Sequence, residues 1–201
     1  MLAVIDYDAG NIKSVENAFK YLGADICVTR DPKEIMRADR VILPGVGAFG
    51  DAMNKLNEYK LTEVIRTVVG SGTPFMGICL GLQLLFDSSE ESEGVSGLSI
   101  LPGKIRKIPD TPGLKIPQIG WNDLKYPNKG RLFEGIDEGS YVYFVHSFYL
   151  DADDKSIVTA TTEYGTRIEA SVEKDNVFAC QFHPEKSAEV GMEILRNFLK
   201  V

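Results

Sequence analysis

One cysteine stands between two glycines, in the segment Gly77-Ile-Cys79-Leu-Gly81, where a predicted strand meets a predicted helix. The pattern is that of a nucleophile elbow with cysteine in place of serine. Such a turn strains the nucleophile, and its glycines leave room where a side chain would strike neighbouring backbone. Free N–H groups at a helix start favour thiolate over thiol. The segment therefore predicts Cys79 as a nucleophile, whereas Cys27 and Cys180 lie within predicted strands and are expected in the core.

A histidine and a carboxylate stand two residues apart in His183-Pro184-Glu185, after a predicted strand over residues 177–182. A thiolate needs an imidazole to transfer protons, and the imidazole needs a carboxylate to fix its tautomer. In extended backbone, residues i and i+2 point the same way, so both side chains can face one site. The other histidine, His146, has no acidic neighbour and is predicted to pack beside the site without catalysing.

The segment Pro44-Gly-Val-Gly47 follows a predicted strand over residues 40–43. Ligands of open α/β sheets bind at the carboxyl ends of the strands, so an N–H of this loop could stabilise an oxyanion. A plain strand-to-helix turn is the alternative, and no phosphate-loop motif is present. The glycines let the peptide before Val46 rotate, so that either its carbonyl or its N–H faces the oxyanion.

These segments must be positioned by the elements around them. Apolar runs predict strands at 2–5, 25–29, 40–43 and 74–78, and helical spacing predicts helices at 12–22, from Asp31-Pro32 onward, and at 50–57, 60–70 and 80–87. This alternation predicts a mostly parallel sheet with helices on both faces. Further strands are predicted at 98–101, 104–108, 141–149, 156–162, 167–172 and 177–182, and a helix at 188–199. The expectation is one α/β domain over residues 1–201 with a β-rich second half.

Composition excludes several classes of protein. With 22 basic and 29 acidic residues the net charge is −7, which disfavours non-specific nucleic-acid binding. No apolar run approaches the ~20 residues of a membrane helix, and the N-terminus lacks the positive region of a signal peptide. Three scattered cysteines fit a reducing cytoplasm, where we expect the protein. Two histidines offer little for a zinc site, so neither a metal nor a cofactor is expected.

Taken together, Pro44-Gly-Val-Gly47, Gly77-Ile-Cys-Leu-Gly-Leu-Gln83 and His183-Pro-Glu185 resemble the class I (triad-type) glutamine amidotransferases over nearly the whole chain. The resemblance implies that family's flavodoxin-like α/β fold and the release of ammonia from glutamine, with no cofactor. Four further segments narrow the resemblance to one branch of the family: Asp6-Tyr-Asp-Ala-Gly-Asn-Ile-Lys-Ser14, Pro117-Gln-Ile-Gly-Trp-Asn122, Tyr143-Phe-Val-His-Ser-Phe-Tyr149 and Phe182-His-Pro-Glu-Lys-Ser187. They are similar to the glutaminase subunits of imidazole glycerol phosphate synthase in histidine biosynthesis. That branch implies a heterodimer with a (β/α)₈-barrel cyclase subunit, which uses the ammonia.

The resemblance also implies roles for individual residues. The catalytic set is Cys79, His183 and Glu185; the oxyanion set is Val46, Gly47 and Leu80; the substrate-binding set is Gly47, Gln83, Glu91, Ser147 and Phe148; and the partner-facing set is Asn11, Trp121, Asn122 and Lys186. Positions 147 and 148 are often Thr and Tyr in the family, so a phenolic contact at 148 is lost here. Trp121, in a predicted Gly-Trp-Asn turn, is expected to anchor the partner, with a core position as the alternative.

Three alternatives stay open at this point. The chain could be the glutaminase subunit of another synthase, such as pyridoxal phosphate synthase. It could be a cysteine peptidase or other hydrolase on the same fold, which would act without a partner or free glutamine. It could also be a catalytically silent binding module, although the intact Cys79, His183 and Glu185 set argues against that.

Overall fold

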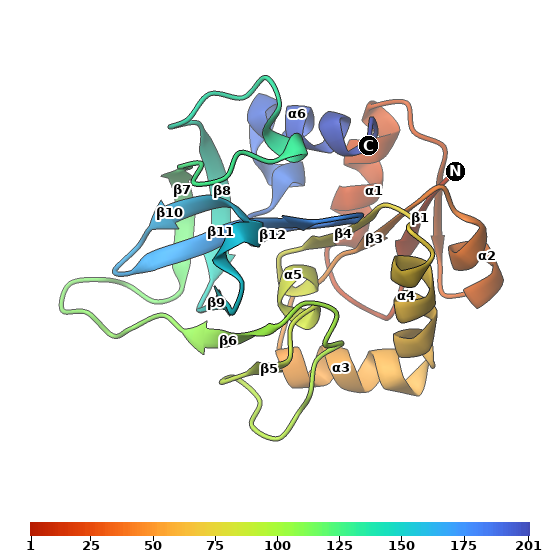
Figure 1. Ribbon diagram of the computed structural model, residues 1–201, viewed down its shortest axis with the longest axis horizontal. Helices are drawn as coiled ribbons and strands as arrows, with labels where there is room; N and C mark the ends of the chain where they lie inside the picture. The colour runs from red at the N-terminus through yellow and green to blue at the C-terminus, as the bar shows by residue number, and fades with distance from the viewer.

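The computed structural model describes residues 1–201 and begins with alternating strands and helices (Figure 1). The strands of this half are β1 (Leu2–Ile5), β2 (Ile26–Thr29), β3 (Arg40–Leu43) and β4 (Phe75–Ile78). The helices are α1 (Ile12–Tyr21), α2 (Pro32–Arg37), α3 (Phe49–Glu58), α4 (Leu61–Gly70) and α5 (Leu80–Leu84). Helix α2 begins as predicted, because the Asp31 side chain accepts a hydrogen bond from the Lys33 N–H and proline takes the first helical position.

The second half is rich in strands and ends in one helix. Its strands are β5 (Ser88–Ser89), β6 (Gly103–Lys107), β7 (Gln118–Asp123), β8 (Tyr141–His146), β9 (Phe148–Ala152), β10 (Val158–Glu163), β11 (Arg167–Lys174) and β12 (Val177–Cys180), followed by helix α6 (Ala188–Phe198). Short 3₁₀ turns occupy Arg131–Phe133, Lys155–Ile157 and Pro184–Lys186. No helix has the length and apolar composition needed to cross a membrane.

The main sheet has the strand order β2-β1-β3-β4-β12-β11-β9-β6-β5, with β10 paired to β11, and β7 and β8 form a separate two-stranded sheet. The strands β2, β1, β3, β4 and β12 run parallel, whereas β12, β11, β9 and β6 pair antiparallel. The parallel part follows the order of flavodoxin-like sheets. The predicted fold class is therefore confirmed, with the antiparallel extension supplied by the β-rich half.

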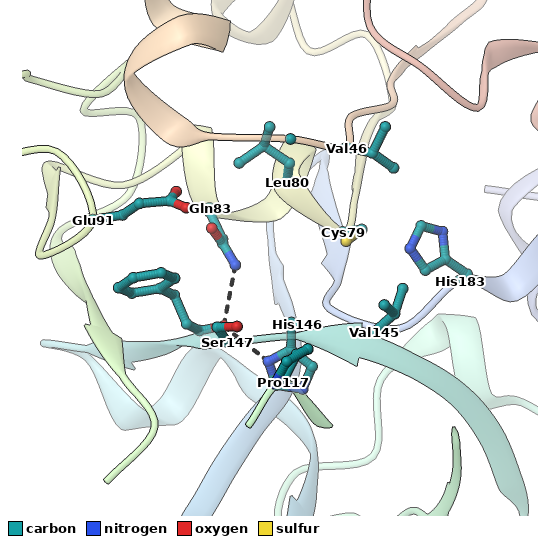
Figure 2. A pocket seen from close by; sticks show the side chains of 12 residues that line it. Val46, Cys79, Leu80, Gln83, Glu91, Pro117, Val145, His146, Ser147 and His183 are labelled. Carbon is teal, nitrogen blue, oxygen red and sulfur yellow. Dashed lines mark hydrogen bonds between the residues drawn. The ribbon is translucent and has the colours of Figure 1, made fainter. Parts of the chain in front are cut away.

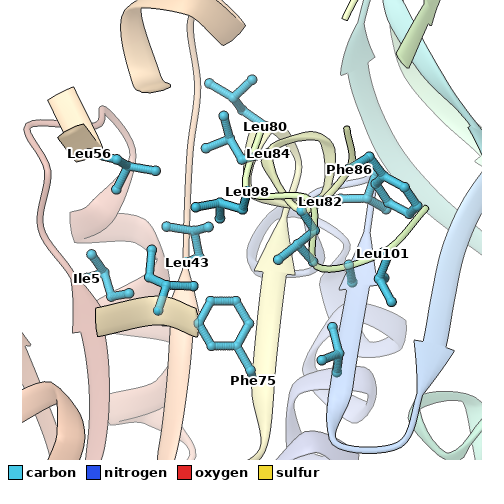
Figure 3. Close-up of a cluster of buried hydrophobic side chains, with 14 of the residues drawn as sticks. Ile5, Leu43, Leu56, Phe75, Leu80, Leu82, Leu84, Phe86, Leu98 and Leu101 are labelled. Carbon is cyan, nitrogen blue, oxygen red and sulfur yellow. The ribbon is translucent and has the colours of Figure 1, made fainter. Parts of the chain in front are cut away.

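Helices cover both faces of the parallel strands, as predicted (Figure 1). Because side chains alternate along a strand, Leu2 and Val4 of β1 enter one buried cluster with α1 and α6, while Ala3 and Ile5 enter the other with α3 and α4. Figure 3 shows part of this second cluster. Strands buried on both faces explain the continuous apolar runs in the sequence.

The predicted strand at 98–101 is wrong, and the predicted helix at 80–87 ends early, at Leu84. Both differences have one cause. The N–H groups of Leu98 and Ile100 donate to the carbonyls of Leu84 and Leu85, at 2.8 and 2.9 Å. The last carbonyls of a helix need such donors, so residues 98–101 serve the end of α5 rather than a neighbouring strand.

Four other expectations need correction. The predicted strand at 141–149 is broken at Ser147 into β8 and β9, and the strand predicted from 156 begins as a 3₁₀ turn before β10. Trp121 lies inside strand β7, paired with Tyr143 of β8, and not in a turn. Cys27 is only partly buried because β2 is the edge strand of the sheet, whereas Cys180 is fully buried.

Candidate active site

The segments singled out in the sequence meet at one edge of the parallel sheet. Asn11 follows β1, residues 44–47 follow β3, Cys79 follows β4 and His183 follows β12, and these four strands are neighbours in the sheet. A cavity of about 340 Å³ lies at this edge (Figure 2). It is lined by Val46, Gly47, Cys79, Leu80, Gln83, Glu91, Pro117, Val145, His146, Ser147, Phe148 and His183. Every residue predicted for the nucleophile, the oxyanion and the substrate is among them.

Cys79 sits in the strained turn that its flanking glycines predict. Its backbone has φ 56° and ψ −110°, a conformation that residues other than glycine rarely adopt. A Cβ at Gly77 would lie 2.6 Å from the Gly81 carbonyl oxygen, and a Cβ at Gly81 would lie 1.9 Å from that of Leu43. Only glycine allows β4, α5 and β3 to approach this closely, and the turn raises the sulfur into the cavity.

His183 and Glu185 form a buried pair beside the cysteine. Nδ1 of His183 lies 2.7 Å from Oε1 of Glu185, and both side chains are out of contact with solvent. The other ring nitrogen, Nε2, has no hydrogen-bond partner. Burial lowers the pKa of His183, but the interactions with Cys79 and Glu185 outweigh burial and raise it to about 9. The carboxylate thus fixes one ring nitrogen and leaves the other free for proton transfer in the cavity.

Asn11, predicted to face a partner, also contacts this pair. Its side-chain amide donates to Oε1 of Glu185 and lies 3.5 Å from Nδ1 of His183. Its backbone is left-handed, with φ 71°, which asparagine tolerates better than most residues. Asn11 therefore helps to hold the carboxylate, and this contact spans 174 positions of the chain.

The 44–47 loop places a carbonyl where an oxyanion donor would be needed. The Leu80 N–H donates to the Gly45 carbonyl at 3.2 Å. Because a trans peptide holds C=O and N–H on opposite sides, the Val46 N–H points away from Leu80. The Tyr7 hydroxyl donates to the Pro44 carbonyl at 2.8 Å and fixes the start of the loop. Of the two orientations that the sequence allows, this structure adopts the one with the carbonyl inward.

The predicted substrate residues Gln83, Glu91, Ser147 and Phe148 line the same cavity as Cys79. Nε2 of Gln83 donates to the Phe148 carbonyl at 3.2 Å, which joins α5 to β9 beside Ser147. Oε2 of Glu91 accepts a hydrogen bond from the Phe49 N–H at 2.8 Å, at the first residue of α3. The acidic residue therefore caps the helix that follows the 44–47 loop while it lines the cavity.

His146 lies in the cavity wall and is buried, as predicted for a packed histidine. Burial lowers its pKa to about 4, although the hydrogen bond to the Phe148 backbone opposes this shift. The ring is therefore neutral at pH 7 and donates from Nδ1 to the Phe148 carbonyl at 2.8 Å.

The predicted partner-facing residues are not all on one face. Trp121 is 52% exposed and packs edge-to-face on Tyr143, with ring centroids 6.0 Å apart. Asn122 follows it in β7, so its side chain points to the opposite face and donates to the Glu163 carbonyl. Lys186 is exposed.

Sequence reasoning missed two residues of the site, Tyr7 and Gln181. Gln181 is fully buried and its Nε2 donates to the Cys79 sulfur at 3.8 Å. The available signal was a polar residue at the end of the apolar run 177–182, since a buried polar group must find a partner.

Comparison with known proteins agrees with this geometry. The model of the family "Glutamine amidotransferase class-I" matches residues 3–201. A protein of Bacillus cereus (strain G9842) named "Imidazole glycerol phosphate synthase subunit HisH" is 53% identical over 198 residues, which is 98% of this chain and 93% of that one. A protein of the same name from Moorella thermoacetica is 50% identical over 197 residues, again 98% and 93% of the two chains.

Solved structures share the fold at low sequence identity. A crystal structure of glutamine amidotransferase superposes with a TM-score of 0.77 at 20% identity, covering 98% of this chain and 97% of that one. The structure of PurLQS from Thermotoga maritima gives 0.77 at 23% identity, covering 99% and 97%. Below 25% identity these neighbours establish the fold alone, whereas the family model and the close relatives cover the chain almost end to end. The protein belongs to the class I glutamine amidotransferase family.

Proposed function

We propose that this protein is a glutaminase subunit that hydrolyses glutamine to glutamate and ammonia and passes the ammonia to a cyclase subunit. The cyclase product would be imidazole glycerol phosphate, with AICAR released, as in histidine biosynthesis. The observation that carries the proposal is the strained Cys79 at the cavity where His183 presents its unpartnered Nε2. The names of relatives at 50–53% identity favour this branch over another synthase or a peptidase.

The reaction is an acyl transfer. The Cys79 thiolate attacks the side-chain amide carbon of glutamine, and the C–N bond breaks as protonated His183 gives a proton to the leaving ammonia. Water then attacks the glutamyl thioester as His183 takes one of its protons, and the C–S bond breaks to release glutamate and restore the thiolate beside protonated His183. Glu185, bonded to Nδ1, holds the ring so that Nε2 faces the reacting atoms.

The 44–47 loop is proposed to control the rate. The tetrahedral intermediate carries an oxyanion, which needs the N–H groups of Leu80 and Val46. In the structure the Leu80 N–H donates to the Gly45 carbonyl. The peptide before Val46 must therefore rotate before both N–H groups can donate to the oxyanion. Gln83, Glu91, Ser147 and Phe148 are placed to hold the rest of glutamine, because they line the cavity together with Cys79.

The proposed partner is a (β/α)₈-barrel cyclase, docked over the β7–β8 face that carries Trp121. This face also exposes Ile119 and Tyr141, an apolar area of the kind that interfaces bury. Asn11, also predicted to face the partner, bonds directly to Glu185 of the catalytic pair. The three free thiols suit the reducing cytoplasm in which this pathway is expected.

The test combines the chain with the cyclase subunit from the same source. The wild-type pair is expected to make imidazole glycerol phosphate from glutamine or from ammonium salts. With Cys79→Ala the pair should still form and still use ammonium, while glutamate release is lost. Glutamate release that survives in Cys79→Ala, or a pair that uses neither nitrogen source, would contradict the proposal.

A further inference from the structure

The sequence contains three glutamines, Gln83, Gln118 and Gln181, and all of them are buried. All three belong to one continuous series of hydrogen bonds that ends at the sulfur of Cys79. Burying an amide is unfavourable unless its donors and acceptor are bonded, so each link of the series constrains the next.

The direction of the series is set by a backbone carbonyl. The Phe148 oxygen can only accept, so the Gln83 atom that faces it at 3.2 Å is the donor Nε2. The same Nε2 lies 3.0 Å from the Gln181 side chain, whose facing atom must therefore be the acceptor Oε1. The amide nitrogen of Gln181 is thereby turned toward Cys79, where it lies 3.8 Å from the sulfur.

The other end of the series reaches the exposed β7–β8 sheet. His146 is neutral at pH 7 and donates to the same Phe148 carbonyl at 2.8 Å. Its Nε2 lies 2.9 Å from Oε1 of Gln118, the first residue of β7. Because this ring nitrogen carries no proton it can only accept, so the Gln118 amide must turn its NH₂ group toward the ring to form the hydrogen bond. Strand β7 carries the exposed Trp121, so the series joins that surface to the nucleophile.

We propose that Gln181 is a further catalytic residue: its side-chain amide donates to the Cys79 sulfur, stabilises the thiolate, and is held in that orientation by Gln83. The physical reason is that a hydrogen bond strengthens when its acceptor becomes an anion. The inference rests on the proposed role of Cys79 as nucleophile. Its test reads the sulfur directly, without glutamine, so that the two can fail separately.

The test is the pH dependence of iodoacetamide alkylation at Cys79 in the full chain, followed on the Cys79 peptide by mass spectrometry. Gln181→Met removes the donor at similar length. Gln181→Glu keeps an acceptor for Gln83 but puts a carboxyl oxygen near the sulfur. In both variants the pH of half-maximal alkylation should rise by about one unit or more, which corresponds to at least a tenfold smaller thiolate fraction at neutral pH. The rise should be larger in Gln181→Glu than in Gln181→Met.

The matched control is Asn197→Leu, which removes another buried amide whose two hydrogen bonds involve no residue of the cavity. Asn197 donates to the carbonyls of Leu132 and Glu134 from α6, so its loss destabilises the fold without touching the site. Its alkylation profile should match that of the wild type. An unchanged profile in both Gln181 variants, or an equal shift in Asn197→Leu, would overturn the inference.

A measurement on the wild-type chain covers the case in which the Gln181 variants do not fold. With ¹⁵N-labelled glutamine the spectrum holds three side-chain amides, and the Gln181 signal should titrate with Cys79 and stop titrating once Cys79 is alkylated. A Gln181 signal indifferent to both would refute the contact. If the alkylation profile shifts as expected but the chain releases no glutamate with its partner, Gln181 keeps its role and the proposed glutaminase function fails.

Discussion

The isolated chain should be a poor glutaminase, and the cyclase with its nucleotide substrate should activate it. In the structure the Leu80 N–H is bonded to the Gly45 carbonyl at 3.2 Å, and the Val46 N–H of the same peptide points away. Loss of one oxyanion donor typically costs about 10²–10³ in rate, or about 2.7–4 kcal/mol. Since the resting loop withholds at least one donor, activation of at least about 10²–10³ is expected.

The energy needed for this change is modest. Rotation breaks one neutral hydrogen bond, with a net contribution of about 0.5–1.5 kcal/mol. The glycines on either side of Val46 allow the peptide to turn without a Cβ clash. Activation of about 10²–10³ requires that the isolated chain favour the inward carbonyl by about 2.7–4 kcal/mol, so this hydrogen bond supplies only part of the resting preference, and the partner must overcome all of it.

The assay measures glutamate release by the chain alone, by the chain with the cyclase, and by the pair with the cyclase's nucleotide substrate. The rate should rise in that order, mostly through kcat, while iodoacetamide reactivity at Cys79 changes little. Synthesis from ammonium salts by the same pair is the control for an intact cyclase. Equal rates of glutamate release in all three samples would show that the 44–47 loop does not control the rate and would make the protein a constitutive hydrolase.

Three further outcomes are expected. Gly47→Ala should lower partner-stimulated kcat by about tenfold or more and change the KM for glutamine less. Gly47 has φ 101°, where alanine is strained by about 1–3 kcal/mol, whereas the added Cβ would meet no atom within 4 Å. A fall in kcat/KM that comes from KM alone would argue against an effect on the loop. Trp121→Ala should raise the Kd for the cyclase by roughly tenfold, measured by calorimetry, with the Tm of the isolated chain nearly unchanged, since half of the side chain is exposed; a large fall in Tm with unchanged Kd would instead place it in the core. The pKa of His183, raised from 6.5 to about 9 in the fold, means that the folded chain keeps a proton that the unfolded chain loses, so stability from this group is full below pH 6.5 and is lost as pH rises to 9. Urea unfolding across this window should show the decline in the wild type and not in His183→Gln, and a parallel decline in both would assign it to other groups.

Features that depend on neighbouring residues could be predicted from the sequence. The cramped turn at Cys79 follows from glycines two positions away on either side, because steric exclusion acts over a few residues. The start of α2 follows from Asp31 and Pro32 for the same local reason. The apolar runs marked the buried strands because both faces of a parallel sheet are covered. Burial alone did not separate a strand from an irregular segment, and so residues 98–101 were predicted wrongly.

Residue types and their spacing were enough to identify the chemical groups of the site: a thiol, an imidazole, a carboxylate and a glycine-rich loop, each at the end of a predicted strand. The connections between these groups come from the packing of distant segments. This packing placed Asn11 on Glu185, turned the Gly45 carbonyl toward Leu80, and aimed the Gln181 amide at the nucleophile. A buried polar group must find a partner, but its identity depends on which distant strands pack side by side. Those contacts join positions as many as 174 residues apart, beyond the reach of any local pattern.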